Sequence, residues 1–204
     1  MTFVKITQGS FNQGNGRFGE SAGKQCTCCS LFSIIFSTIK SPGYWTRPDL
    51  DYILSNGTEI YRNTNKHNND YVLFIELPRE IIIFEDCKFS IEFLDIQVGL
   101  LHHNSVYGSI GFNHNLDSRI DGFLFILNGV CISVTWNKTS FFLFDSHSRN
   151  EHGISSSEGT STVMKFNSKK ALETFIIRNY LTENATKIFS LNYNISQLIK
   201  KIRH

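Results

Sequence analysis

Apolar residues recur with a helical period in one early segment of the chain. Over residues 27–40 they return at steps of three and four, with a second face of small serines and few charges. Ser41-Pro42-Gly43 follows as a stop signal. This pattern predicts a helix that is buried on most of its sides.

The clearest strand pattern comes in the second half of the chain. Residues 123–127 are continuously apolar, as in a strand covered on both faces. Asn128-Gly129 is a hairpin signal, and residues 130–136 then alternate between apolar and polar. A second turn precedes a third strand over 141–145. We expect these three antiparallel strands to form the centre of a sheet.

The other segments give weaker signals. We expect further strands at Phe3–Ile6, Val72–Glu76, Ile81–Phe84 and Lys187–Asn192. Further helices are expected at Thr46–Asn56, Ser168–Leu181 and Ile195–Ile202. We expect loops up to residue 25 and over 60–70, 101–122 and 148–161. Asn56-Gly57 is interpreted as a helix stop, and Ser168 as a helix N-cap. Without an internal repeat or a long linker, a single α+β domain over residues 1–204 is predicted.

Composition narrows the class of protein. The chain has 204 residues, of which 41% are hydrophobic and 19% charged, as in a globular domain. A net charge of +2 does not favour a nucleic-acid partner. No apolar run approaches a membrane span, and the first ten residues do not resemble a secretion signal. Five cysteines, three of them within four positions, indicate reduced thiols in an intracellular protein.

The first candidate for chemistry is Cys26. It follows Gly23-Lys24-Gln25 at the start of the predicted helix. There the unpaired backbone N–H groups and the helix dipole favour a thiolate, the nucleophile of cysteine hydrolases. Cys28 and Cys29 lie inside the first helical turn, where one or both should face the core as small hydrophobic residues. Cys26 is therefore the better candidate nucleophile.

A second candidate is the pair Asp145 and His147, at the end of the third predicted strand. Alternate side chains of a strand share a face, and their Cα atoms lie about 6.6 Å apart. The carboxylate can then reach Nδ1 of the imidazole and orient it, as in a Cys-His-Asp triad. We expect both groups at a sheet edge facing solvent. The alternative is a strand-end Asp and His that only cap a turn.

Two further assignments concern the surroundings of the thiol. Gln13, in a glycine-rich loop thirteen residues before Cys26, could donate its side-chain amide to an oxyanion together with the Cys26 backbone N–H. The competing interpretation makes the three clustered cysteines metal ligands with His102 or His103. The Cys-x-Cys-Cys spacing disfavours it, because a second ligand pair is missing. We therefore expect neither a metal nor a cofactor.

These residues resemble the deubiquitinating cysteine protease domain of herpesvirus large tegument proteins and its tegument-like relatives. The resemblance rests on Gln13, Phe18-Gly19, Ala22-Gly23-Lys24-Gln25-Cys26 and Phe144-Asp145-Ser146-His147. It implies a papain-like fold, with a central nucleophile helix packed on a mostly antiparallel sheet. It also implies Cys26 as nucleophile, His147 as general base and acid, Asp145 as its orienting group and Gln13 in the oxyanion hole.

The resemblance implies that ubiquitin or polyubiquitin is the partner, with hydrolysis of its C-terminal isopeptide bond. The Gln13–Glu20 loop and part of 101–122 are expected to wall the channel for the ubiquitin tail. Two alternatives remain open: a protease for another ubiquitin-like modifier, and an inactive ubiquitin-binding module. We expect a monomer without a membrane or nucleic-acid partner, in the cytoplasm or nucleus or delivered into a host cell.

Overall fold

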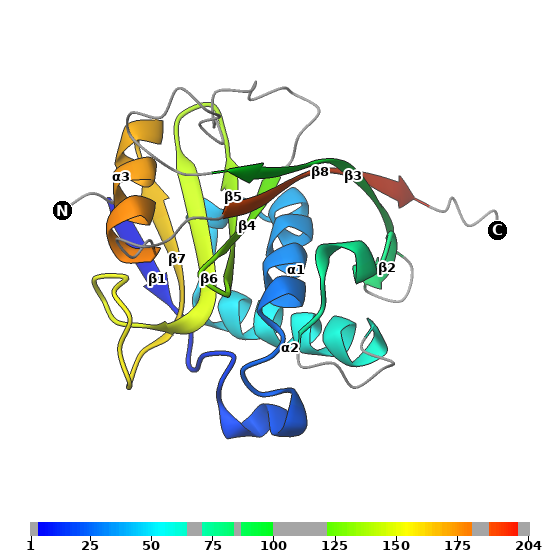
Figure 1. Ribbon diagram of the computed structural model, residues 1–204, viewed down its shortest axis with the longest axis horizontal. Helices are drawn as coiled ribbons and strands as arrows, with labels where there is room; N and C mark the ends of the chain where they lie inside the picture. The colour runs from blue at the N-terminus through cyan, green and yellow to red at the C-terminus, as the bar shows by residue number, and fades with distance from the viewer. Residues whose placement is uncertain (1–3, 65–70, 84–86, 100–121, 181–187, 200–204) are drawn as a thin grey trace.

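The computed structural model describes residues 4–64, 71–83, 87–99, 122–180 and 188–199. In this part of the chain, an eight-stranded antiparallel sheet carries helices on both faces (Figure 1). The elements are β1 (Lys5–Gln8), η1 (Gly16–Ser21), α1 (Cys26–Ile39), η2 (Pro42–Tyr44), α2 (Arg47–Thr64), η3 (Phe74–Glu76), β2 (Glu80–Ile83), β3 (Cys87–Gly99), β4 (Gly122–Leu127), β5 (Val130–Trp136), β6 (Phe141–Arg149), β7 (Thr160–Phe166), α3 (Lys169–Tyr180) and β8 (Ile188–Ile199). The strand order is β1-β7-β6-β5-β4-β8-β3-β2. The predicted α+β class is confirmed.

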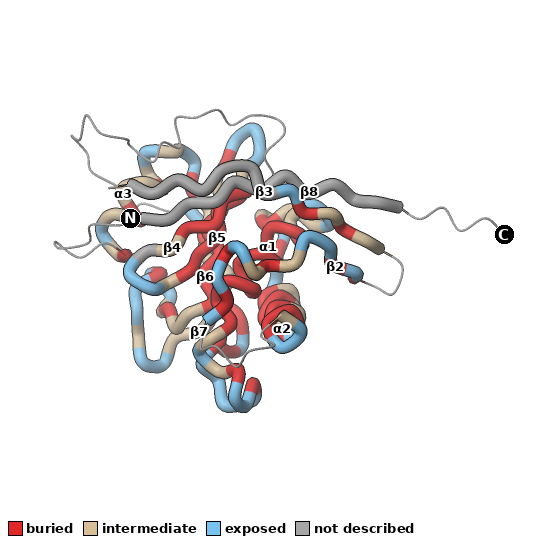
Figure 2. Tube along the Cα trace, turned by 45° about the vertical axis from the view of Figure 1, so that its right-hand side comes forward, coloured by how far each residue is buried: buried red, intermediate tan, exposed pale blue. Residues whose placement is uncertain are grey.

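The sheet separates two hydrophobic cores. The α1 core contains side chains of α1 and α2 with Phe142 and Phe144 of β6. The α3 core contains side chains of α3 with Leu143 of β6 and Met164 of β7. Buried segments are concentrated in α1 and the central strands (Figure 2). Because both faces are covered, the central strands are apolar in consecutive positions, as the sequence of β4 predicts.

The predicted buried helix is present as α1. Every residue from Cys26 to Phe36 is buried. The small-residue face contacts β5: Ser30 Oγ donates to the Cys131 carbonyl at 3.2 Å, and the hydroxyls of Ser33 and Ser133 are hydrogen-bonded. Serine lets the helix approach the sheet closely while each buried hydroxyl finds a partner. This contact fixes the position of the α1 N-terminus relative to β5.

The predicted stop at Asn56-Gly57 is wrong, because α2 continues to Thr64. A Cβ atom on Gly57 would lie 2.5 Å from the Cα atom of Cys29. The glycine is therefore required by the close crossing of α1 and α2 rather than by a turn. The sequence signal was that of a helix end, but its cause is tertiary packing.

Long-range pairing explains the other differences from prediction. Residues 74–76 form the 3-10 helix η3 instead of a strand, and 195–199 end β8 instead of starting a helix. β8 lies between β4 and β3, so both of its edges are paired, and this overrides a weak helical period. β3 and β7 were not predicted. The loop predicted over 101–122 lies outside the described residues except for Gly122, which begins β4.

Other predictions are confirmed. The hairpin strands β4, β5 and β6 are adjacent in the sheet, and β2 lies within one residue of its expected range. α3 begins after Ser168, whose Oγ accepts from the backbone N–H of Ala171 at 3.2 Å, as expected of an N-cap. β1 lies two residues later than expected. Among the described helices, not one has the length and apolar character needed to cross a membrane.

Candidate active site

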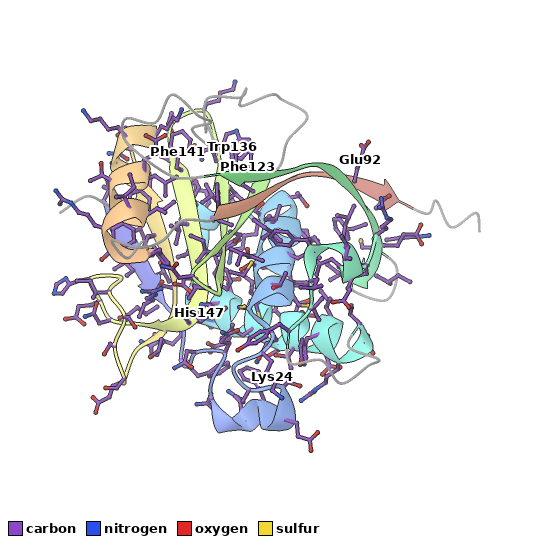
Figure 3. All side chains as sticks on the ribbon, viewed as in Figure 1. Lys24, Glu92, Phe123, Trp136, Phe141 and His147 are labelled. Atoms are coloured by element: carbon purple, nitrogen blue, oxygen red, sulfur yellow. The ribbon has the colours of Figure 1, made fainter. Side chains whose placement is uncertain are left out.

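Asp145 and His147 make the contact that their spacing predicts. His147 Nδ1 lies 2.7 Å from Asp145 Oδ1, and the backbone N–H of His147 donates to the same oxygen at 2.8 Å. The carboxylate thus holds the imidazole at Nδ1 and leaves Nε2 for a reacting group. Figure 3 places His147 near the end of β6, toward the segment that carries Lys24 and leads into α1.

The expectation that both groups face solvent is wrong for Asp145, which is fully buried. β6 does not end at His147 but continues to Arg149. Its pairing with β7 shifts register between Asp145 and Arg149, so His147 lies where the strand pairing is irregular. Such a shift can re-aim the side chains of a strand end, and here His147 lies next to Cys26 of α1 while Asp145 is buried.

Cys26 lies at the first residue of α1, next to His147. Burial raises the pKa of its thiol, whereas the hydrogen bond and positive charge of His147 lower it. Hydrogen bonds from the Cys131 backbone and the Thr27 side chain add to this effect, so the net pKa lies below 9.0. The reciprocal effect appears at His147: burial favours the neutral ring, yet Asp145 and Cys26 raise its pKa to about 9. The two opposite pKa shifts favour a thiolate–imidazolium pair.

The neighbouring thiols have the opposite character. Cys28, Cys29 and Cys131 are buried, and burial raises the pKa of each. The negative charge of a Cys26 thiolate nearby raises these pKa values further. Both Cys28 and Cys29 therefore face the core, and Cys26 alone of these four is poised as a thiolate.

Gln13 is held between α1 and β6. Its backbone N–H donates to the Ser146 carbonyl at 2.8 Å, and its own carbonyl accepts from Gln25 Nε2 at 2.9 Å. Gln25 is itself fully buried and directly precedes Cys26. The Gln13 side chain is buried as well, and its Oε1 has no hydrogen-bond partner among the described residues. The structure thus brings Gln13, Cys26, Asp145 and His147 to one place.

Sequence reasoning missed two residues of this cluster. Arg149 Nε donates to Asp145 Oδ2 at 2.6 Å, and the Tyr180 hydroxyl lies 2.7 Å from the same oxygen. Arg149 lies only four positions after Asp145, but the pairing shifts between them, so a regular strand period does not predict their contact. Tyr180 lies 35 positions away in α3, so no local pattern could have found it.

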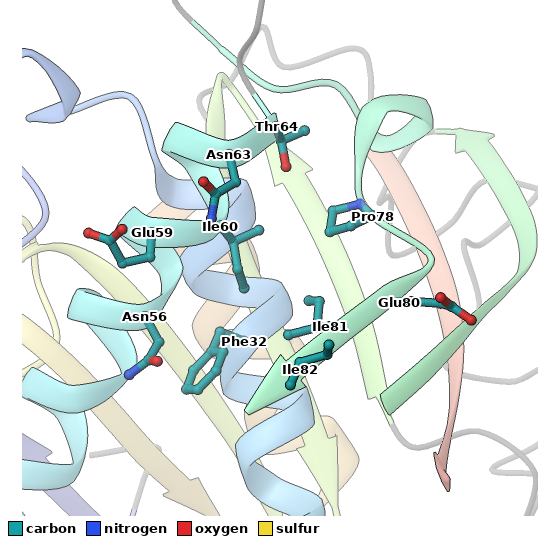
Figure 4. Close-up of a pocket in the computed structure, with 10 residues that line it drawn as sticks. All are labelled: Phe32, Asn56, Glu59, Ile60, Asn63, Thr64, Pro78, Glu80, Ile81 and Ile82. Atoms are coloured by element: carbon teal, nitrogen blue, oxygen red, sulfur yellow. The ribbon is translucent and has the colours of Figure 1, made fainter. Parts of the chain in front are cut away.

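A separate cavity of about 420 Å³ lies between α2 and β2 (Figure 4). It is lined by Phe32, Asn56, Glu59, Ile60, Asn63, Thr64, Pro78, Glu80, Ile81 and Ile82. None of the candidate catalytic side chains lines it. Within the described ranges, we find no group of three or more potential metal ligands. His102 and His103, considered as ligands with the clustered cysteines, lie outside those ranges.

A helix-terminal thiol beside a His–Asp pair is an arrangement that cysteine hydrolases use for nucleophilic catalysis. The model of the herpesvirus tegument protein N-terminal conserved region matches residues 8–198, and the chain belongs to this family. The resemblance to the tegument domain is thereby confirmed.

Two relatives extend the comparison. The large tegument protein deneddylase of Alcelaphine herpesvirus 1 (strain C500) is 23% identical over 217 residues, which cover 96% of this chain but only 8% of that protein. The crystal structure of the ubiquitin-specific protease encoded by murine cytomegalovirus tegument protein M48, in complex with a ubiquitin-based suicide substrate, matches with a TM-score of 0.81. That match covers 98% of this chain and 90% of the other at 12% identity, and it confirms the expected fold.

Proposed function

We propose that this protein is a deubiquitinating cysteine protease that hydrolyses the isopeptide bond at the ubiquitin C-terminus, and that residues 1–204 form one protease domain. The observation that carries the proposal is the placement of Cys26 next to His147, whose imidazole lowers the pKa of the thiol and is held at Nδ1 by Asp145. The M48 protein, a structural relative, is a ubiquitin-specific protease.

In the proposed reaction, the Cys26 thiolate attacks the carbonyl carbon of the terminal ubiquitin glycine. The backbone N–H of Cys26 and the side-chain amide of Gln13 stabilise the oxyanion. His147 donates its proton to the departing lysine amine, which leaves a thioester on Cys26. A water molecule, deprotonated by His147, then hydrolyses the thioester and regenerates the thiolate. Asp145 keeps the imidazole oriented throughout.

The test is covalent labelling of the folded protein by ubiquitin that carries a C-terminal electrophile. Wild type should form one adduct at Cys26, and Cys26→Ala should form none. Cys28→Ala is the matched control, because its thiol is buried behind the nucleophile, and it should be labelled like wild type. Labelling of Cys26→Ala, or binding of ubiquitin without any adduct in wild type, would contradict the proposal.

A second candidate substrate is the ubiquitin-like modifier NEDD8, because the Alcelaphine herpesvirus relative is named a deneddylase. Parallel reactions with ubiquitin and NEDD8 electrophiles at equal concentration separate the two candidates. Faster labelling by the NEDD8 electrophile would make NEDD8 the preferred substrate. The proposed roles of Cys26 and His147 would be unchanged.

A further inference from the structure

Asp145 accepts four hydrogen bonds, divided equally between its two oxygens. Oδ1 accepts from Nδ1 and from the backbone N–H of His147. Oδ2 accepts from Arg149 Nε at 2.6 Å and from the Tyr180 hydroxyl at 2.7 Å. A fully buried carboxylate with one oxygen fixed by two donors cannot rotate, so the other oxygen stays directed at the imidazole.

Arg149 and Tyr180 are themselves firmly held. The Arg149 side chain is 5% exposed, and its guanidinium carbon lies 4.3 Å from the centre of the Tyr180 ring. The Tyr180 carbonyl accepts from Asn128 Nδ2 at 2.8 Å, which joins the end of α3 to the β4–β5 turn. A buried arginine, stacked on a ring and paired with a carboxylate, is costly to place unless all its contacts are made together.

We propose that Arg149 and Tyr180 are positioning residues for the catalytic histidine of the proposed protease. They fix the Asp145 carboxylate, and the guanidinium offsets part of its charge, so that Asp145 orients His147 without stabilising the imidazolium too strongly. The assignment rests on the proposed function for its role in turnover. Its structural part, control of His147 through Asp145, is independent of the substrate.

The charged groups around Asp145 and His147 decide in which direction the pKa of His147 should change. The titratable groups that face Asp145 are His147 and Arg149 from β6 and Tyr180 from α3, and those that face His147 are Asp145 and Cys26. The strand partner of Asp145 in β7 is the uncharged Thr162. Removing the guanidinium leaves the carboxylate charge less compensated, which favours the imidazolium. The pKa of His147 should therefore rise above about 9.

The test compares Arg149→Met and Tyr180→Phe with Arg178→Met and Tyr44→Phe. Arg178 is exposed near the end of α3 and Tyr44 is exposed in η2, so both controls should match wild type. Turnover of a fluorogenic ubiquitin amide is measured against pH. In Tyr180→Phe we expect kcat to fall about tenfold with KM unchanged, the order expected for one hydrogen bond to a charged group. In Arg149→Met, kcat should fall further, and the alkaline limb of its pH–rate profile should move to higher pH.

A substrate-independent measurement separates this proposal from the proposed function. The rate of Cys26 alkylation by iodoacetamide is followed against pH by mass spectrometry, and circular dichroism reports the folded fraction. Deprotonation of His147 should appear as a step in the plot of alkylation rate against pH. The pH of this step should rise in Arg149→Met and, by less, in Tyr180→Phe. Arg149→Lys keeps the charge but not the stacked planar group, so it should restore the step without restoring kcat.

Folded variants with the wild-type step and wild-type kcat would overturn the proposal. So would a loss of activity that follows only the loss of folded protein, because that would be a purely structural role. If wild type reacts with neither the ubiquitin nor the NEDD8 electrophile, the proposed function fails, while the alkylation profiles still decide whether Arg149 and Tyr180 control the histidine.

Discussion

The two faces of the sheet contribute different parts of the candidate site. The α1 face supplies the thiol of Cys26 and, through Gln25, the anchor of the Gln13 loop. The α3 face supplies Tyr180, which reaches Asp145 in β6. His147 lies in the stretch of shifted pairing between Asp145 and Arg149, next to Cys26. Neither core contains a complete site, so the chemistry depends on the irregular end of one strand that joins them.

Removing the His147 side chain, which lies between the two faces, should have the largest effect on activity. His147→Ala removes the side chain that interacts with both Cys26 and Asp145. We expect kcat/KM on a ubiquitin amide to fall by about 10²–10⁴-fold, the range for loss of a general acid and base. His152→Ala, an exposed histidine in the following turn, is the control and should retain wild-type kinetics. Equal losses in the two variants would argue against a special role for His147.

The α1 side of the comparison is tested by Gln13→Ala. Loss of one oxyanion donor should lower kcat by about 10²–10³-fold while KM changes little. The Cys26 thiol should still be alkylated by iodoacetamide at the wild-type rate, because His147 and Asp145 are untouched. Lys138→Ala, in the exposed turn between β5 and β6, provides the control. A parallel loss of alkylation would mean that Gln13 acts on the thiol rather than on the oxyanion.

The smallest expected effect concerns the packing of the α1 core alone. A methyl group on Gly57 would meet the backbone of Cys29, so Gly57→Ala must push the two helices apart. We expect a loss of about 1–3 kcal/mol in the free energy of unfolding, measured by urea denaturation. Gly16→Ala, with nothing near its added methyl group, should be close to wild type. If both variants have the same stability, the close crossing is not a packing constraint.

Local patterns sufficed for much of the molecule. The period of 27–40 predicted α1, and Asn128-Gly129 with its flanking strands predicted the sheet centre. Asp145 and His147 could be paired because a strand alternates its faces over two residues. These features depend on residues that are close in sequence, so they can be predicted without knowledge of the fold.

The remainder depends on partners far along the chain. β3 is defined by its pairing with β8, about a hundred residues later, and β1 pairs with β7 over a longer interval. Tyr180 meets Asp145 only because α3 folds back on β6 and β7. At Gly57 a local signal misled the prediction. Glycine is typical of helix ends, but here it allows two helices to cross closely. Propensity cannot report contacts that only the assembled sheet creates.

The strand order has a consequence for how this protein is made on the ribosome. Cys26 is synthesised more than a hundred residues before His147, the residue proposed to activate it, and Tyr180 comes later still. β4 and β3 cannot join until β8 has emerged to fill the gap between them. The nascent chain therefore carries an ordinary, weakly reactive thiol until His147 and the strands up to β8 have been synthesised. In the proposed site, its reactivity arises only when these strands have left the exit tunnel and the sheet has closed.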